Sequence, residues 1–242
     1  MLRLPRASLL AFAAAAFVLV GIKLLFATYP GDYPVKDQAE AFTWTFVIGV
    51  IAFGLAGLFA DRSLSNEDAF PDPFGDGARA REGLLVAVAT GAAYGIVTIL
   101  QDLPAPGSGN PLNLTDWPHV PWPWSMPFYT FGAIFLEFML RLGALCILVW
   151  IIHVVILRRR WLMPVFWVVN VIVATYEIMP ATLESISANA WLEVARTPIE
   201  PLFFTNVFEG WLLLRYGWLS PIAFRLSFYL FWHVIYGGLG PF

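Results

Sequence analysis

The residues of this chain that could carry out chemistry are ionisable or amide side chains inside otherwise apolar segments. The first pair is Glu137 and Arg141, a carboxylate and a guanidinium four residues apart. On a helix this spacing puts both side chains on one face, one turn apart. The pair is either a structural ion pair that helps both residues tolerate an apolar environment, or a catalytic carboxylate oriented by its arginine.

Two later apolar segments carry further polar residues. Asn170 and Glu177 lie in the first of these segments, and Asn206 and Glu209 lie in the second. An amide on an apolar helix commonly bridges to a neighbouring helix by hydrogen bonding, which is one reading of Asn170. Glu177 lies near the expected outer end of its segment, where it is either an interface residue or a site residue.

The last apolar segment carries Arg225, Tyr229 and His233 at intervals of four residues, and hence along one stripe of a helix. We expect three carboxylates, two arginines and this histidine to converge between helices. A metal-activated water with a carboxylate base is one use of such a site. Histidine with carboxylate ligands suits zinc, although one histidine is few for a catalytic zinc site.

The composition excludes a soluble globular protein. Hydrophobic residues make up 59% of the chain and charged residues 13%, against about 45–50% and about 25% in soluble domains. The net charge of −3 and the absence of a basic stripe exclude nucleic acid as a partner. Cys146 is the single cysteine, so the chain has no intrachain disulfide and no cysteine-rich metal site.

Apolar length predicts an all-α fold, a polytopic transmembrane bundle of about seven spans, because a span needs about 20 mainly apolar residues. We expect Leu9–Ala27 to be a retained first span rather than a cleaved signal peptide, because it is long and contains Lys23. The region 127–157 is long enough to tilt, project or break near Gly143, and we expect one helix there. The predicted spans are Leu9–Ala27, Ala41–Ala60, Gly83–Leu100, Pro127–Leu157, Trp161–Pro180, Ile199–Leu214 and Trp218–Leu239.

The connecting segments set the expected orientation, because lysine and arginine in short loops favour the cytoplasm. With alternating spans, nine arginines fall on one side, and Lys36 and Arg196 fall on the other. The N-terminus is therefore predicted to be cytoplasmic and the C-terminus outside, in a bacterial inner membrane. The loop 61–82 is expected to be irregular and cytoplasmic, and the tryptophan-rich loop 101–126 is expected to lie along the outer interface.

In the region 131–236 the order of these features resembles the CPBP family of CAAX-protease and bacteriocin-processing membrane proteins. The family's first motif is Glu-Glu, three residues, then Arg; Glu137 and Arg141 match its second Glu and its Arg, while Leu136 replaces the first Glu. Its second motif is Phe, three residues, then His, and the nearest residues here are Val173 and Glu177.

The third motif has a histidine four residues before Asn or Asp on the final helix, and here Arg225 and Tyr229 take those places. His233 lies one turn further on, where some members have another histidine. The segment 210–217, the arginines after Leu157 and the pair Trp167 and Asn170 also look like the family's connecting regions. The resemblance implies residues 1–126 as an N-terminal three-span region and residues 127–242 as a CPBP-like four-helix core.

In the family, glutamates and histidines are taken to activate water for peptide-bond hydrolysis in the membrane. Without the first Glu and both motif histidines, we expect a non-catalytic membrane protein that binds another membrane protein or lipids. The first alternative is an active intramembrane metalloendopeptidase that uses Glu137 as base, Arg141 as its orienting partner, and a zinc ion with Glu177 and His233 as its ligands. The second is an accessory or assembly subunit of a larger membrane complex. We also expect Arg225 to pair with an embedded carboxylate, Glu177 in preference to Glu137.

Overall fold

The described part of the chain is helical throughout and contains no strand. The computed structural model describes residues 6–65, 71, 77–102, 119–176, 179 and 201–237. Its α-helices are α1 (Arg6–Thr28), α2 (Lys36–Ala41), α3 (Trp44–Ser65), α4 (Gly77–Asp102), α5 (Ser125–Glu137), α6 (Cys146–Trp150), α7 (Leu162–Ala174), α10 (Pro201–Tyr216) and α11 (Leu219–Tyr229). Its π-helical segments are η1 (Phe138–Leu145), η2 (Ile151–Ile156) and η4 (Leu230–Gly237).

Four helical runs are long and apolar enough to cross a bilayer. They are Arg6–Thr28, Trp44–Leu64, Gly77–Leu100 and Ser125–Ile156. Their outward faces carry large apolar side chains, such as Phe17 and Leu85, which are 76% and 61% exposed. Apolar surface of this extent is typical of a protein that lipid surrounds.

Every predicted span coincides with a helix, but the helices differ in length from the prediction. The region 127–157 forms one continuous helical run, because α5, η1, α6 and η2 follow one another without a break. The fifth helix, α7, is shorter than predicted: it ends at Ala174, and Thr175 and Tyr176 form a turn. The helices at the three remaining predicted spans are α7, α10 and α11 with η4. None of them combines the length and the apolarity of the four helical runs that can cross a bilayer.

The loop 61–82 is shorter than the sequence predicted, because both of its ends are helical. Helix α3 continues to Ser65, and α4 begins at Gly77. The segment Ala78-Arg-Ala-Arg81 consists of good helix formers, which extend α4 toward the turn residues of the loop. Proline and glycine, which we took to mark the whole region as irregular, are confined to residues 71–77.

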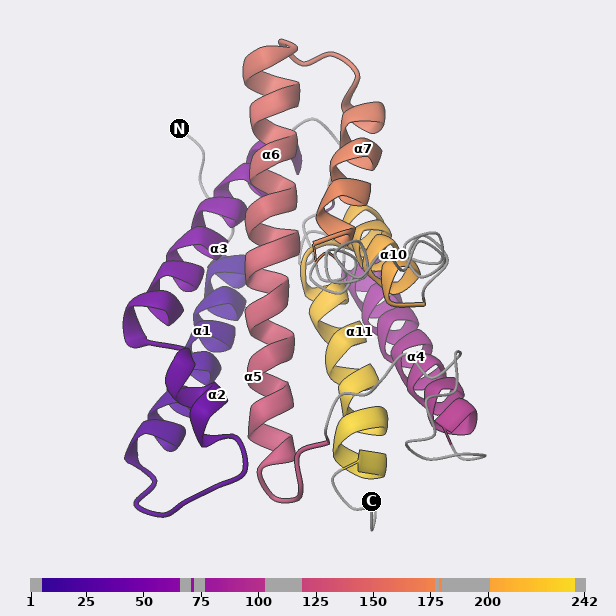
Figure 1. Ribbon diagram of the computed structural model, residues 1–242. Helices are drawn as coiled ribbons and strands as arrows, with labels where there is room; N and C mark the ends of the chain where they lie inside the picture. Colours follow the sequence, from indigo (N-terminus) through magenta and orange to yellow (C-terminus); the bar gives the residue numbers. More distant parts are fainter. Residues whose placement is uncertain are drawn as a thin grey trace, which may run out of the picture.

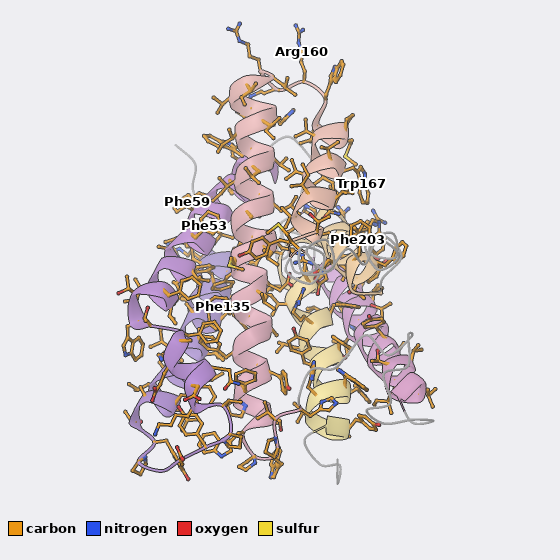
Figure 2. The ribbon with its side chains drawn as sticks, in the orientation of Figure 1. Phe53, Phe59, Phe135, Arg160, Trp167 and Phe203 are labelled. Carbon is orange, nitrogen blue, oxygen red and sulfur yellow. The ribbon has the colours of Figure 1, made fainter. Side chains whose placement is uncertain are left out.

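The long helical run from α5 to η2 lies in the middle of the molecule (Figure 1). Helices α1, α2 and α3 lie on one side of it, and α4, α7, α10 and α11 lie on the other. Phe135 lies on the side that faces α1–α3, where its ring contacts Phe42 and Phe46 with centroids 5.2 and 5.3 Å away (Figure 2). The long helix therefore joins two groups of helices, and its inner faces contribute to the core of both.

Helix α4 packs closely on α11 through small residues four positions apart. These are Gly83, Ala87, Gly91 and Gly95. A Cβ atom on Gly91 would overlap the carbonyl oxygen of Phe224, so the two backbones approach more closely than larger residues allow. Small residues at this spacing are the common means of close helix packing in membranes. This packing holds α11, which carries Arg225, in place.

Candidate functional site

The centre of the candidate site lies where α5 changes into the π-helical segment η1. Glu137 is the last residue of α5, and Arg141 lies in the first turn of η1. Glu137 is about 18 Å along the helix from Ser125, at about 1.5 Å per residue, so it lies well inside the candidate span Ser125–Ile156. Inserted π-helical turns are frequent at functional sites, and another one, η4, begins directly after Tyr229.

Two further helices bring polar side chains to the same point. Helix α10 supplies Asn206 and Glu209, and α11 supplies Arg225. Together with Glu137 and Arg141, these side chains form a set that we call the ionic cluster. Each of the five residues is at most 4% exposed.

Arg225 binds both carboxylates of the ionic cluster. Its Nε donates to Glu137 Oε1 at 2.7 Å, and its Nη2 donates to Glu209 Oε2 at 2.6 Å. Nη2 also donates to Asn206 Oδ1 at 2.9 Å, and Nη1 donates to the Tyr229 hydroxyl at 3.3 Å. The guanidinium thus ties α5, α10 and α11 together, as a planar group with five donors can.

Arg141 binds mainly to α10 rather than to its own helix. Its Nη2 donates to the side chains of Glu209 and Asn206, and to the Asn206 carbonyl oxygen at 3.1 Å. Its Nε lies 3.8 Å from Glu137 Oε2, which is within ion-pair distance but too long for a hydrogen bond. The expected Glu137–Arg141 pair is therefore present, but Glu209 is the closer partner of Arg141.

The charges within the ionic cluster balance, with two carboxylates against two guanidinium groups. Buried charges of this kind persist only when they are paired and hydrogen-bonded, because the low-dielectric interior disfavours a lone ion strongly. Glu137 Oε2, Arg141 Nη1 and Asn206 Nδ2 have no hydrogen-bond partner among the described residues. The cluster is thus electrically neutral and keeps some unused hydrogen-bonding capacity.

Asn170 lies beside the ionic cluster and has a structural role. Its Nδ2 on α7 donates to the carbonyl oxygen of Val207 on α10 at 3.0 Å. The side chain also packs on Gly210, where an added Cβ would overlap the amide. Asn170 is thus the bridge between helices that its sequence context allowed.

His233 does not join the ionic cluster. Its ring stacks on Tyr129 with centroids 4.0 Å apart and planes 12° apart, and its centroid lies 5.4 Å from that of His119. Tyr229 connects this aromatic group to the cluster, because its hydroxyl binds Arg225 and its ring lies 5.1 Å from His233. The structure therefore brings Glu137, Glu209 and the two arginines together, and it places His233 beside Tyr229 rather than on the carboxylates.

One participant, His119, escaped the sequence analysis. It belongs to a proline-rich segment outside the apolar runs, so hydropathy gave no signal for it. Glu209 was expected among the converging carboxylates, but the sequence did not indicate that it binds both arginines. Its spacing of three residues from Asn206 was the available signal, because that spacing puts both side chains on one face of α10.

The side chains of the site do not fit a zinc ion. Zinc ligands are carboxylate, imidazole or thiolate groups, and at least three come from the protein. Within the described ranges no three His, Cys, Asp or Glu side chains gather in such an arrangement. The carboxylates of Glu137 and Glu209 instead bind guanidinium groups, whose charge repels a cation.

Glu177, the expected metal ligand and first-choice partner of Arg225, lies outside the described residues. The second-choice partner of Arg225, Glu137, does bind it.

Comparisons of the chain with protein-family models, curated proteins and solved structures find no match. The function of the protein is therefore inferred from the geometry of the site and from the sequence pattern.

Proposed function

We propose that this chain is a non-catalytic membrane protein with a degenerate CPBP-like core, which binds another membrane protein or lipids. The observation that carries the proposal is the double engagement of Arg225, which lies 2.7 Å from Glu137 and 2.6 Å from Glu209. In the family, a histidine is expected at this position and carboxylates at the facing one. A guanidinium in that place uses the carboxylates as ion-pair partners and keeps a metal cation away.

The proximity of the motif positions supports the resemblance to the family. The first motif supplies Glu137 and Arg141, and the third motif supplies Arg225 and Tyr229, from helices 88 residues apart along the chain. Their side chains meet in one cluster, as the remains of a shared catalytic site would. The polar residues are retained, whereas their chemical types now favour ion pairing over metal binding.

We further propose seven spans, with the N-terminus in the cytoplasm of a bacterial cell and the C-terminus outside the inner membrane. Arg79, at the start of α4, donates from Nε to the carbonyl oxygen of Arg215 near the end of α10, at 3.0 Å. Alternating spans require these two ends to lie on the same side of the membrane. Arginine-rich ends on that side agree with the bias of positive residues toward the cytoplasm.

Metal content and peptide cleavage test the absence of catalysis. The protein is purified in detergent, incubated with zinc, dialysed and analysed for bound metal, and is then challenged with membrane-anchored peptides. We expect far less than one zinc per chain and no cleavage, in the wild type and in Glu137→Gln alike. Stoichiometric zinc together with cleavage that Glu137→Gln abolishes would overturn the proposal and favour the active endopeptidase.

Native extraction tests the binding role. The chain is extracted from its membrane into polymer nanodiscs without detergent, and the intact complexes are weighed by mass spectrometry. We expect a membrane protein or lipid bound in fixed ratio. A bare monomer or homodimer would contradict this role, and would equally remove support for the accessory-subunit alternative.

A further inference from the structure

A polar cleft is lined by residues of α1, of α2 and of the start of α3. These three helices lie on one side of the long helix, and α10 and α11, which contribute to the ionic cluster, lie on the other (Figure 1). The cleft's volume of about 450 Å³ lies within the range of small-molecule sites, roughly 300–1,000 Å³. The chain has two lysines, and both line this cleft. The polar and aromatic residues that line it include Lys23, Lys36, Glu40, Tyr29, Tyr33 and Trp44.

Lys23 is a buried lysine on the α1 wall of the cleft. It is 7% exposed, and its Nζ donates to the carbonyl oxygen of Ala39 on α2 at 2.7 Å. An ammonium group has three protons to donate, so this bond leaves two. Among the described residues, no carboxylate lies within ion-pair distance of Lys23. A buried ammonium without a counter-ion favours an anion in the cleft beside it.

The opposite charge is found at the mouth of the cleft. Glu40 is exposed and makes no ion pair within the described ranges, whereas Lys36 binds Asp32 at 3.3 Å. That hydrogen bond raises the pKa of Lys36, and burial, followed by the charge of Glu40, raises the pKa of Tyr33. The cleft is thus lined by the buried amino group of Lys23 at depth and by the exposed carboxyl group of Glu40 at its mouth.

The depth of the cleft matches the headgroup layer of a bilayer. It lies along the last two turns of α1, from Lys23 to Ala27, and is bordered by Tyr29, just after that helix, and by Trp44, which are 44% and 39% exposed. Tyrosine and tryptophan are enriched at the membrane–water interface. The most abundant anion at that depth is the phosphate of phospholipids.

We propose that this cleft binds the phosphoethanolamine headgroup of a phospholipid, with its phosphate against Lys23 and its ammonium against Glu40. A phosphate accepts several hydrogen bonds and suits a lysine as a point charge. The ammonium of the headgroup finds Glu40 and the faces of the aromatic rings at the mouth. The site lies apart from the ionic cluster, so it stands or falls independently of the non-catalytic role proposed above.

Native mass spectrometry of the protein in a phosphate-free detergent tests the proposal. Phosphatidylethanolamine, phosphatidylglycerol and diacylglycerol with the same acyl chains are added in separate titrations, and inorganic phosphate in a fourth. We expect one tightly retained phosphatidylethanolamine and no retained diacylglycerol. Lys23→Met should weaken phospholipid retention about tenfold or more, since it removes a charge-assisted contact. Inorganic phosphate that binds with the same dependence on Lys23, while phospholipids do not, would assign the cleft to free phosphate and overturn the lipid.

Matched variants separate the two halves of the headgroup. Glu40→Gln should reduce the preference for phosphatidylethanolamine over phosphatidylglycerol by up to about fivefold, the range of an exposed ion pair. Arg160→Met removes an exposed cation at the opposite end of the molecule and should change neither lipid (Figure 2). An unchanged preference in Glu40→Gln, or equal retention in Lys23→Met and Arg160→Met, would overturn the proposal.

A second measurement uses the wild-type chain, so that the test does not depend on the folding of Lys23→Met. Lysine-selective acylation, followed by peptide mapping, gives the separate rates of Lys23 and Lys36. Phosphatidylglycerol, which carries no amine, should slow the acylation of Lys23, and diacylglycerol should not. Equal rates with the two lipids would refute the phosphate contact without any substitution.

Discussion

Removal of the Arg225 guanidinium should be among the most destabilising single changes in this protein. The substitution Arg225→Met keeps much of the side-chain volume and removes two ion pairs, at 2.7 and 2.6 Å, from a residue that is 4% exposed. It leaves two buried carboxylates with one guanidinium. Loss of one partner from a buried ion pair costs about 3–5 kcal/mol, or about a hundredfold to several thousandfold in the unfolding equilibrium.

Two double variants locate the charge that is left uncompensated. Arg141 binds Glu209 directly but only approaches Glu137, at 3.8 Å. Without Arg225, Glu137 is therefore the carboxylate that lacks a cation, and adding Glu137→Gln should recover about 2 kcal/mol or more. Adding Glu209→Gln restores the same net charge but removes the close partner of Arg141, so it should recover less.

The unfolding of each variant is followed by maleimide labelling of Cys146 in detergent with increasing denaturant. The thiol is fully buried and is the single cysteine, so labelling reports opening of the core. Arg160→Met serves as the control, since an exposed substitution should stay within about 0.5 kcal/mol. If Arg225→Met is as stable as this control, or if both double variants match the single one, the assigned pairing is wrong.

Three further outcomes follow from other parts of the structure. Gly91→Val should destabilise the fold by about 1–3 kcal/mol, because α11 leaves no room for a Cβ atom at this position. Gly49→Val, whose side chain would meet open space, should be nearly neutral. Equal effects of the two substitutions in thermal unfolding would contradict the close packing of α4 on α11. Cys146 should react with maleimide only when the fold opens, and rapid labelling of the native protein would place the thiol at the surface. Asp32→Asn should lower the pKa of Lys36 toward its ordinary value, which NMR of ¹³C-methylated lysine can follow. Any stability from the Lys36–Asp32 pair is present at neutral pH and is lost as the pH rises through the raised pKa of Lys36. Loss of this stability below neutral pH would refute the assigned cause of the shift.

The sequence predicted the secondary structure well because apolar length is a local property. Each predicted span coincides with a helix, since an apolar run must satisfy its backbone hydrogen bonds within itself. The ends of the helices were harder to predict. Polar helix formers extend α4 back to Gly77, beyond the apolar run, and α7 ends at Ala174, short of the predicted span, where Thr175 and Tyr176 form a turn. Hydropathy alone does not report either effect.

The sequence also identified which residues matter at membrane depth, because ionisable groups there are costly and need partners. The sequence did not determine which carboxylate pairs with which arginine. The i,i+4 rule favoured Glu137 for Arg141, and that pair is present at 3.8 Å. The closer partner of Arg141 is Glu209, 68 residues further along the chain on another helix, which local spacing does not predict.

The cleft between α1, α2 and α3 is likewise a feature that single segments of the sequence do not reveal and that only the tertiary structure shows. From sequence, Lys23 was only an interruption in an apolar run, and Lys36 a loop charge. The tertiary structure brings both to one cleft, because α2 folds back over the end of α1 and its Ala39 carbonyl accepts from Lys23. Composition and hydropathy determined that this chain forms membrane-length helices and which of its polar residues are buried in them. The packing of helices far apart in sequence decided which charges meet, because a side chain's partner depends on the direction in which its helix presents it.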